Sequence, residues 1–186
     1  MNLKEKIENY KPYNEQEACD KEMMLEYINT FDDVITRNNK TCHFSSSSWI
    51  VNKDRTKVIM IYHNIYKSWA WTGGHCDGDE DVLHVALKEA EEETGLKNLK
   101  VLDDNIFSLE IITVDSHIKR GKYVCPHLHL NCTFLIEADE NETLRIKEDE
   151  NSGVKWVDIN DVTKLSNESK MIPIYEKINE KLFKIK

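Results

Sequence analysis

The spacing of apolar residues changes from helical to strand-like near residue 40. Before that point, apolar residues recur at intervals of three and four and form one stripe: Met23, Met24, Tyr27, Ile28, Phe31 and Ile35. We therefore predict an N-terminal helical extension over residues 1–41, followed by a single domain over 42–186. The extension either covers a sheet of that domain or forms a homodimer surface.

Short runs of β-branched and aromatic residues follow, and they predict strands. The expected strands lie at 49–51, 58–62, 69–72, 106–114, 124–136 and 154–157. Two helices are expected among them, one over 81–93 and one closing helix around 174–182. This mixture predicts an α+β fold in which helices pack on a mixed sheet.

The helix over 81–93 carries an unusual pattern. Acids crowd its expected first turn, and Gly95 stands where a C-terminal cap belongs. Its inward stripe is apolar in the first half and acidic in the second: Val82, Val85 and Ala86 precede Glu89, Glu92 and Glu93. Carboxylates on an inward face repel one another and lose hydration, and a hard cation such as Mg²⁺ or Mn²⁺ removes both penalties.

A solvated acidic face is the ordinary alternative for such a charge run. The glycines around the helix favour the metal site, because the stretch from Gly74 to Leu96 resembles the Nudix box, G-x5-E-x7-R-E-U-x-E-E-x-G-U, with U a bulky apolar residue. Strict matches fill seven positions: Gly74, Glu80, Glu89, Glu92, Glu93, Gly95 and Leu96. The box arginine is replaced by Lys88, which offers a point charge instead of a planar fork, so catalysis is weaker or the site is arranged differently.

The resemblance implies a Nudix-type α/β/α sandwich, extended to about residues 42–165. It also implies hydrolysis of a nucleoside diphosphate linked to another moiety, with Mg²⁺ or Mn²⁺ as cofactor. The implied metal ligands are Glu89, Glu92, Glu93 and the backbone carbonyl of Gly73. Glu80 would order the box through hydrogen bonds, with Gly74 and Gly95 as structural positions. The implied catalytic set is Glu89, Glu92, Glu150 and Lys88, and the general base is left open between Glu89 and Glu150.

Five residues outside the helix are candidates for substrate binding: His75, Trp71, His127, His129 and Arg120. Each has a structural alternative. Trp71 is suited to stack on a base or to pack in the core. Arg120 lies in a basic cluster that reaches a phosphate or forms an exposed turn. His127 and His129 share a strand face, as pocket residues or as its ordinary polar side, and two histidines are too few for a zinc site.

Charge and cysteine content limit the partners. The 186 residues include 25 Lys and Arg against 34 Asp and Glu, a net charge of −9, which repels a nucleic acid polymer. No apolar run reaches the length of a membrane span. Five cysteines without metal-ligand spacing indicate reduced thiols, so we expect a cytoplasmic protein that acts on a small molecule.

Two other functions stay open. An enzyme similar to isopentenyl-diphosphate isomerase would use the same fold to move a double bond and retain the diphosphate. A non-catalytic nucleotide-binding or sensor module would bind without turnover, and Lys88 is the residue that supports it. An intact set of carboxylates argues against it.

Overall fold

The computed structural model describes residues 2–119 and 121–185. Its helices are α1 (Leu3–Asn9), α2 (Glu15–Thr30), α3 (Val82–Thr94), α4 (Val162–Leu165) and α5 (Ile172–Lys184), with a short 3₁₀ helix, η1 (Ile159–Asp161). Its strands are β1 (Cys42–Val51), β2 (Lys57–His63), β3 (Ser68–Ala70), β4 (Thr72–His75), β5 (Lys100–Val101), β6 (Ser108–Val114), β7 (His117–Lys119), β8 (Lys122–Val124), β9 (His127–Glu137) and β10 (Asn151–Asp158). No helix in these two ranges is long and apolar enough to cross a membrane.

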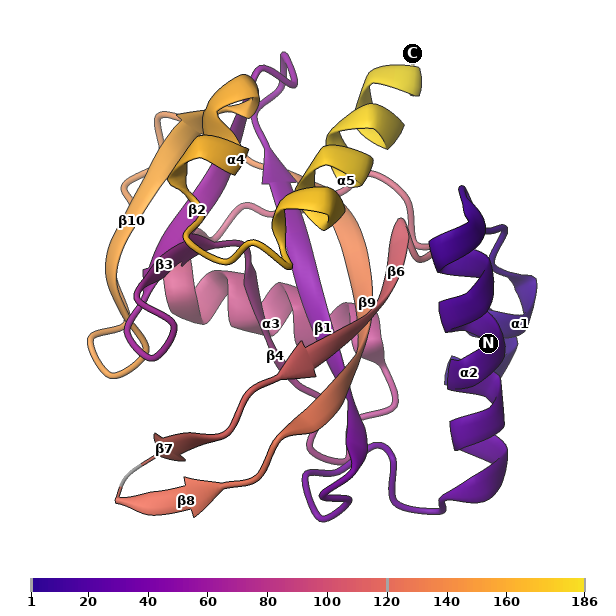
Figure 1. Ribbon diagram of the computed structural model, residues 1–186. Coiled ribbons are helices and arrows are strands. Elements are labelled where there is room, and N and C mark those ends of the chain that lie inside the picture. The colour runs from indigo at the N-terminus through magenta and orange to yellow at the C-terminus, as the bar shows by residue number, and fades with distance from the viewer. Residues whose placement is uncertain (1, 120, 186) are drawn as a thin grey trace.

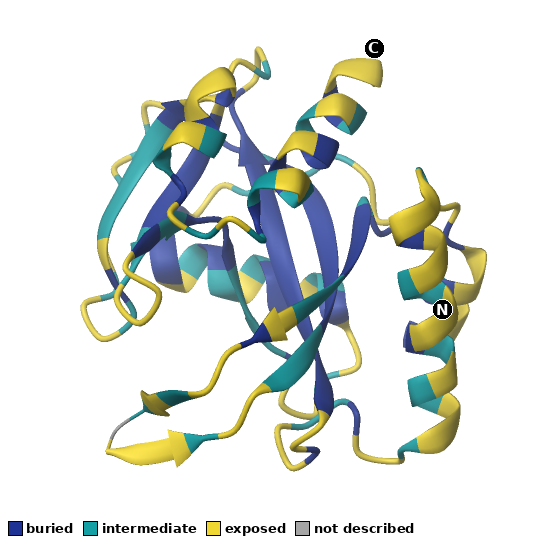
Figure 2. Cartoon of the chain, viewed as in Figure 1, coloured by how far each residue is buried: buried dark blue, intermediate teal, exposed yellow. Residues whose placement is uncertain are grey.

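The strands form one mixed sheet and one separate hairpin. The central order is β10-β2-β1-β9-β5, with β3 paired to β2, β4 to β1 and β6 to β9. Strands β1 and β9 run parallel along ten paired positions, and the other pairs are antiparallel. The β7–β8 hairpin extends from the body and is largely exposed (Figure 2). The expected α+β fold, with helices packed on a mixed sheet, is confirmed.

Helices cover both faces of the sheet (Figure 1). On one face, apolar residues of α3 pack in a core with Phe44 and Phe134. On the other, Tyr175 and neighbouring residues of α5 pack against Trp49 and Trp71. Figure 2 shows the central strands between these layers as the most buried part of the chain.

Strand β1 begins at Cys42, seven residues before the expected start at Trp49. The unexpected part holds four consecutive serines, 45–48, which are all buried. Ser46 Oγ donates to the Val82 carbonyl oxygen at 2.6 Å and Ser48 Oγ donates to that of Ala86 at 3.0 Å. Serine is a poor strand predictor, but here its hydroxyl satisfies carbonyls of α3 while its small size lets the helix approach.

The N-terminal helices cover an edge of the sheet, as expected under the first of the two alternatives for the extension. Helix α2 lies beside β6 (Figure 1). Asp20 accepts a hydrogen bond from the Ile111 backbone N–H at 2.8 Å, and Gln16 donates one to the Leu109 carbonyl at 3.1 Å. Helix α2 ends at Thr30, so the last residues of the predicted stripe lie in the segment after it.

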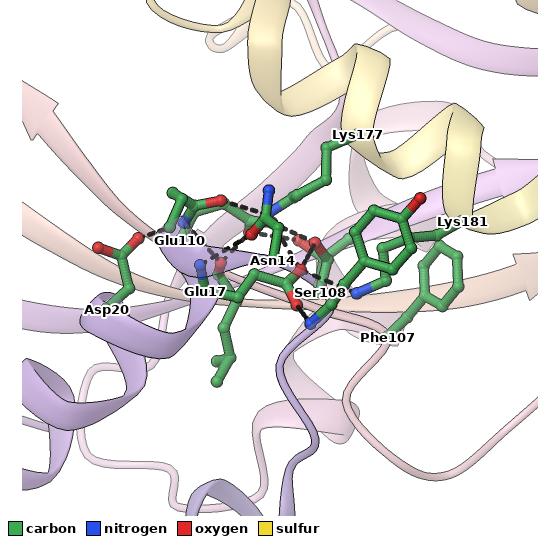
Figure 3. A network of polar contacts seen from close by, with 12 residues as sticks. Asn14, Glu17, Asp20, Phe107, Ser108, Glu110, Lys177 and Lys181 are labelled. Atoms are coloured by element: carbon green, nitrogen blue, oxygen red, sulfur yellow. Dashed lines mark hydrogen bonds and ion pairs between the residues drawn. The ribbon is translucent and has the colours of Figure 1, made fainter.

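A buried network of charges fixes α2 to α5 and β6 (Figure 3). Glu17 of α2 is 0% exposed, and it accepts from Lys181 of α5 at 2.8 Å and from Ser108 of β6 at 2.9 Å. Lys177 lies 3.1 Å from Glu17 and 2.9 Å from Glu110. Each buried charge therefore has an opposite charge within hydrogen-bond range, which offsets its loss of hydration.

Candidate active site

Helix α3 is held at both ends by the residues that flank it. Asp81 is the N-cap, and its side chain accepts from the His84 backbone N–H at 3.3 Å. Gly95 is the C-cap with φ +78°, and its N–H donates to the Glu91 carbonyl at 2.9 Å. The acids expected in the first turn lie before the helix, which begins at Val82 without one; Asp81 acts there as a cap.

Glu93 connects α3 to the glycine pair of β4. Its carboxylate accepts a hydrogen bond from the Gly73 backbone N–H at 3.0 Å, and the residue is 2% exposed. Burial raises the pKa of Glu93 well above its usual value, the hydrogen bond from Gly73 opposes this, and the charges of Glu89 and Glu150 raise it further. A cation at this carboxylate would remove both the burial penalty and the repulsion.

Glu89 lies directly against Gly74. A Cβ atom at position 74 would stand 2.5 Å from the Glu89 Cδ atom, closer than any real contact, so only glycine leaves room for this carboxylate. Burial also raises the pKa of Glu89. The glycine pair thus positions two carboxylates, one by a hydrogen bond and one by close approach.

The other two acids converge on Lys147. The Lys147 ammonium lies 2.6 Å from Glu92 Oε2 and 2.9 Å from Glu150 Oε2. Burial alone would lower the pKa of Lys147, but the hydrogen bonds to these carboxylates outweigh it and raise the pKa. Lys88 is more distant, with its ammonium 3.8 Å from Glu92 Oε1. Lys147 was not among the predicted site residues, although its spacing of three from Glu150 indicates that the two side chains could pair.

The donor set fits a hard divalent cation. Glu89, Glu92, Glu93 and Glu150 offer carboxylate oxygens only, which is the chemistry that Mg²⁺ and Mn²⁺ prefer. Burial is the main cause of the raised pKa values at Glu89 and Glu93, and the charges of neighbouring carboxylates add to it, so a cation would relieve both penalties.

Three of these carboxylates border a cleft of about 610 Å³, a volume typical of small-molecule sites. Glu89, Glu93, Glu150 and Lys88 line one part of it. The lining also includes basic and apolar side chains, among them Arg37, Lys119, Lys170, Trp71, Met171 and Tyr175, together with further acidic and polar residues. Anionic and apolar parts of one ligand would both find partners in such a cleft.

The predicted substrate residues have mixed positions. His75 and His129 line the cleft, and burial lowers the pKa of each to about 2, so both rings are neutral. His127 contacts His129, with 3.2 Å between their Nε2 atoms. Trp71 lines the cleft but is 9% exposed and packs edge-on against Trp49 and Tyr175, so stacking on a base stays a prediction. Arg120 lies outside the described residues.

Glu80 is exposed at the entry to α3, and no hydrogen bond joins it to any other part of the chain that the structure describes. Its expected role in ordering the box stays a prediction.

Comparison with known proteins identifies similar chains. A family model of the NUDIX domain matches residues 43–178. The chain is 29% identical over 140 residues to the RNA pyrophosphohydrolase of Pelagibacter ubique (strain HTCC1062), a match that covers 73% of this chain and 88% of that protein. It is 28% identical over 107 residues to the probable DHNTP pyrophosphohydrolase of Lactococcus lactis subsp. cremoris (strain MG1363), which covers 56% of this chain and 59% of that protein.

Solved structures show the same fold. An Ap4A hydrolase of C. elegans in a binary complex superposes with a TM-score of 0.56 at 18% identity, over 75% of this chain and 97% of that one. The NUDIX domain of Shewanella oneidensis NrtR, complexed with ADP ribose, gives a TM-score of 0.54 at 18% identity, over 84% of this chain and 97% of that one.

Proposed function

Because this chain belongs to the NUDIX family, we propose that it hydrolyses a pyrophosphate linkage in a small nucleoside diphosphate derivative with Mg²⁺ or Mn²⁺. The observation that carries the proposal is that the box carboxylates Glu89 and Glu93 lie against the glycine pair at the cleft. The pyrophosphohydrolase names of the two curated relatives support it.

In this proposal, Glu89, Glu92, Glu93 and the Gly73 carbonyl would hold the cation. The chemistry that Mg²⁺ or Mn²⁺ supplies when bound is neutralisation of the diphosphate and activation of a water molecule. Glu89 and Glu150 both line the cleft, and either would serve as the general base. Lys88 and Lys147 would hold the outer carboxylate Glu92 in position.

Glu93→Gln is the test variant. Glutamine keeps an acceptor for the Gly73 N–H but loses the charge, so the fold should survive while hydrolysis falls by at least ~100-fold. The measurement is product release from a panel of dinucleoside polyphosphates, ADP-ribose and nucleoside triphosphates in Mg²⁺, with the unfolding midpoint as a check.

Glu91→Gln is the matched control, since Glu91 lies on the same helix but pairs with Lys97, 3.4 Å away. It should retain full activity. Equal activity in Glu93→Gln and the wild type would refute the metal assignment.

A 5′-triphosphorylated RNA end is a second candidate substrate, because one relative is named RNA pyrophosphohydrolase. The net charge of −9 disfavours a polymer, so we place small nucleotides first. Adding a triphosphorylated oligonucleotide to the panel separates the two.

The same assay tests the rival functions. An isomerase would return its substrate with the diphosphate intact, and a sensor module would bind nucleotide without turnover. We also propose a cytoplasmic location, which the five free cysteines support.

A further inference from the structure

Four histidines from three adjacent strands meet at one place in the sheet. His43 of β1 pairs with His129 of the parallel strand β9, and His127 lies two residues earlier on the same face of β9. Strand β4 brings His75 opposite Ser45, two residues along β1 from His43. The ring centroid of His43 lies 5.1 Å from those of His75 and His129 and 4.8 Å from that of His127.

The ring nitrogens of these histidines face one another. His129 Nε2 lies 3.2 Å from His75 Nε2 and 3.2 Å from His127 Nε2. One nitrogen each from His43, His75 and His129 all lie within 4.8 Å of one another. Two imidazole nitrogens bound to one tetrahedral zinc ion, each at about 2.0–2.1 Å, are roughly 3.3 Å apart.

Backbone carbonyls fix two of the rings in the tautomer that a metal requires. His43 Nδ1 lies 3.0 Å from the Asn39 carbonyl oxygen, and His127 Nδ1 lies 2.8 Å from that of Cys125. A carbonyl only accepts, so each Nδ1 carries a hydrogen, and the neutral form of each ring presents a lone pair at Nε2. Metal-binding histidines are typically held in this way.

Hydrogen bonds within the cluster do not satisfy these nitrogens. His43 is 4% exposed, and its Nε2 has no hydrogen-bond partner in the described parts of the chain. In the neutral form of His127 its Nε2 carries no hydrogen, so His129 Nε2 must donate to bond it and then cannot accept from His75. At most one of the two 3.2 Å contacts is therefore a linear hydrogen bond, and buried polar atoms are rarely left unpaired.

We propose that His43, His75 and His129 bind one divalent transition-metal ion, with Zn²⁺ as the best fit. Imidazole nitrogens suit zinc, copper, nickel and iron, whereas Mg²⁺ and Mn²⁺ prefer oxygen. The ligand chemistry therefore separates this site from the carboxylates of α3, and the proposal does not depend on the hydrolase activity. Three nitrogens fill three positions of a tetrahedron and leave the fourth to His127 or a water molecule, so the ion would hold β1, β4 and β9 together beside the cleft.

The test uses the full-length chain after removal of metals with a chelator. With Mg²⁺ in excess to occupy the carboxylates, zinc is titrated by calorimetry and Co²⁺ by visible absorption. We expect one zinc ion per chain and the intense cobalt bands of a four-coordinate site. His129→Gln should weaken zinc binding by at least about tenfold.

Two control variants should bind zinc as the wild type does. His84→Gln removes a histidine of α3 whose side chain is 62% exposed, and Glu93→Gln removes a carboxylate of the other site. Absence of zinc binding, or unchanged binding in His129→Gln, would overturn the proposal, as would binding lost only in Glu93→Gln. Should His129→Gln fail to fold, the wild-type cobalt spectrum decides, because weak six-coordinate bands refute a histidine site.

Discussion

At the scale of single residues, the site depends on two glycines whose backbone lies against carboxylates. Gly74 could be predicted as a box position from the sequence. Its contact with Glu89 could not, since that contact joins β4 to a helix residue fifteen positions later. Lys147 and His43 were missed for the same reason. Each lies far from the box in sequence and reaches its partners only through the sheet.

Gly74→Ala should displace Glu89, because the new Cβ would stand 2.5 Å from the Glu89 Cδ atom. A misplacement of about 1 Å at a reacting group costs up to ~100-fold, so we expect kcat to fall 10–100-fold. The measurement is kcat on the best substrate of the panel, together with the unfolding midpoint.

Gly121→Ala is the control, because a Cβ there meets nothing within 4 Å. It should keep its kcat and lose only stability from its positive φ. Unchanged kcat in Gly74→Ala would show that Glu89 does not need its position against β4.

At the scale of elements, helix periodicity and the Nudix box predicted α3 and α5 well, because both signals are local. The predicted end of the N-terminal helix and the predicted start of β1 were both wrong. The strand start was missed because the serines of β1 are buried by partners outside the strand. The sequence also gave no indication of which charged residues of α2 would be buried. Glu17 reads as a surface residue in sequence and is fully buried in the structure.

Glu17→Gln should show how α2 is attached. Burial alone would raise the pKa of Glu17, but hydrogen bonds from Lys181 and Tyr10 and the charge of Lys177 lower it from 4.5 to about 2. A lowered pKa stabilises the folded state above pH 4.5, and that contribution is lost as the pH falls from 4.5 through about 2. The contribution at neutral pH is roughly 3 kcal/mol.

Urea unfolding at pH 7 and pH 3 measures the effect. The variant should be less stable than the wild type at pH 7 by roughly 3 kcal/mol, with a smaller loss between the two pH values. Glu15→Gln is the control, because Glu15 is an exposed acid in the first turn of the same helix. Equal pH dependence in wild type and Glu17→Gln would contradict the assignment.

At the scale of the whole molecule, the N-terminal helices and the sheet share one core. Leu3, Ile7 and Met24 belong to the same buried cluster as Phe44 and Phe134. We therefore expect the extension and the domain to unfold together.

Met24→Ala tests this. Met24 is 0% exposed, so its truncation should cost about 2–5 kcal/mol. All four tryptophans lie outside α1 and α2, so tryptophan fluorescence reports the sheet while circular dichroism also reports these helices. Both signals should shift together to a lower midpoint.

Met23→Ala is the matched control, since Met23 is 40% exposed and should change stability by less than about 0.5 kcal/mol. Loss of helical signal in Met24→Ala before any change in fluorescence would show two independent units.

The hydrogen bonds from Asp20 and Gln16 to β6 have a consequence for self-association. An unprotected outermost strand offers a template on which further chains can pair without limit. Here side chains of α2 bond to the backbone of the outer strand β6, so polymerisation through β6 would first require α2 to detach. Strand pairing between intact copies of this protein would therefore have to use another edge.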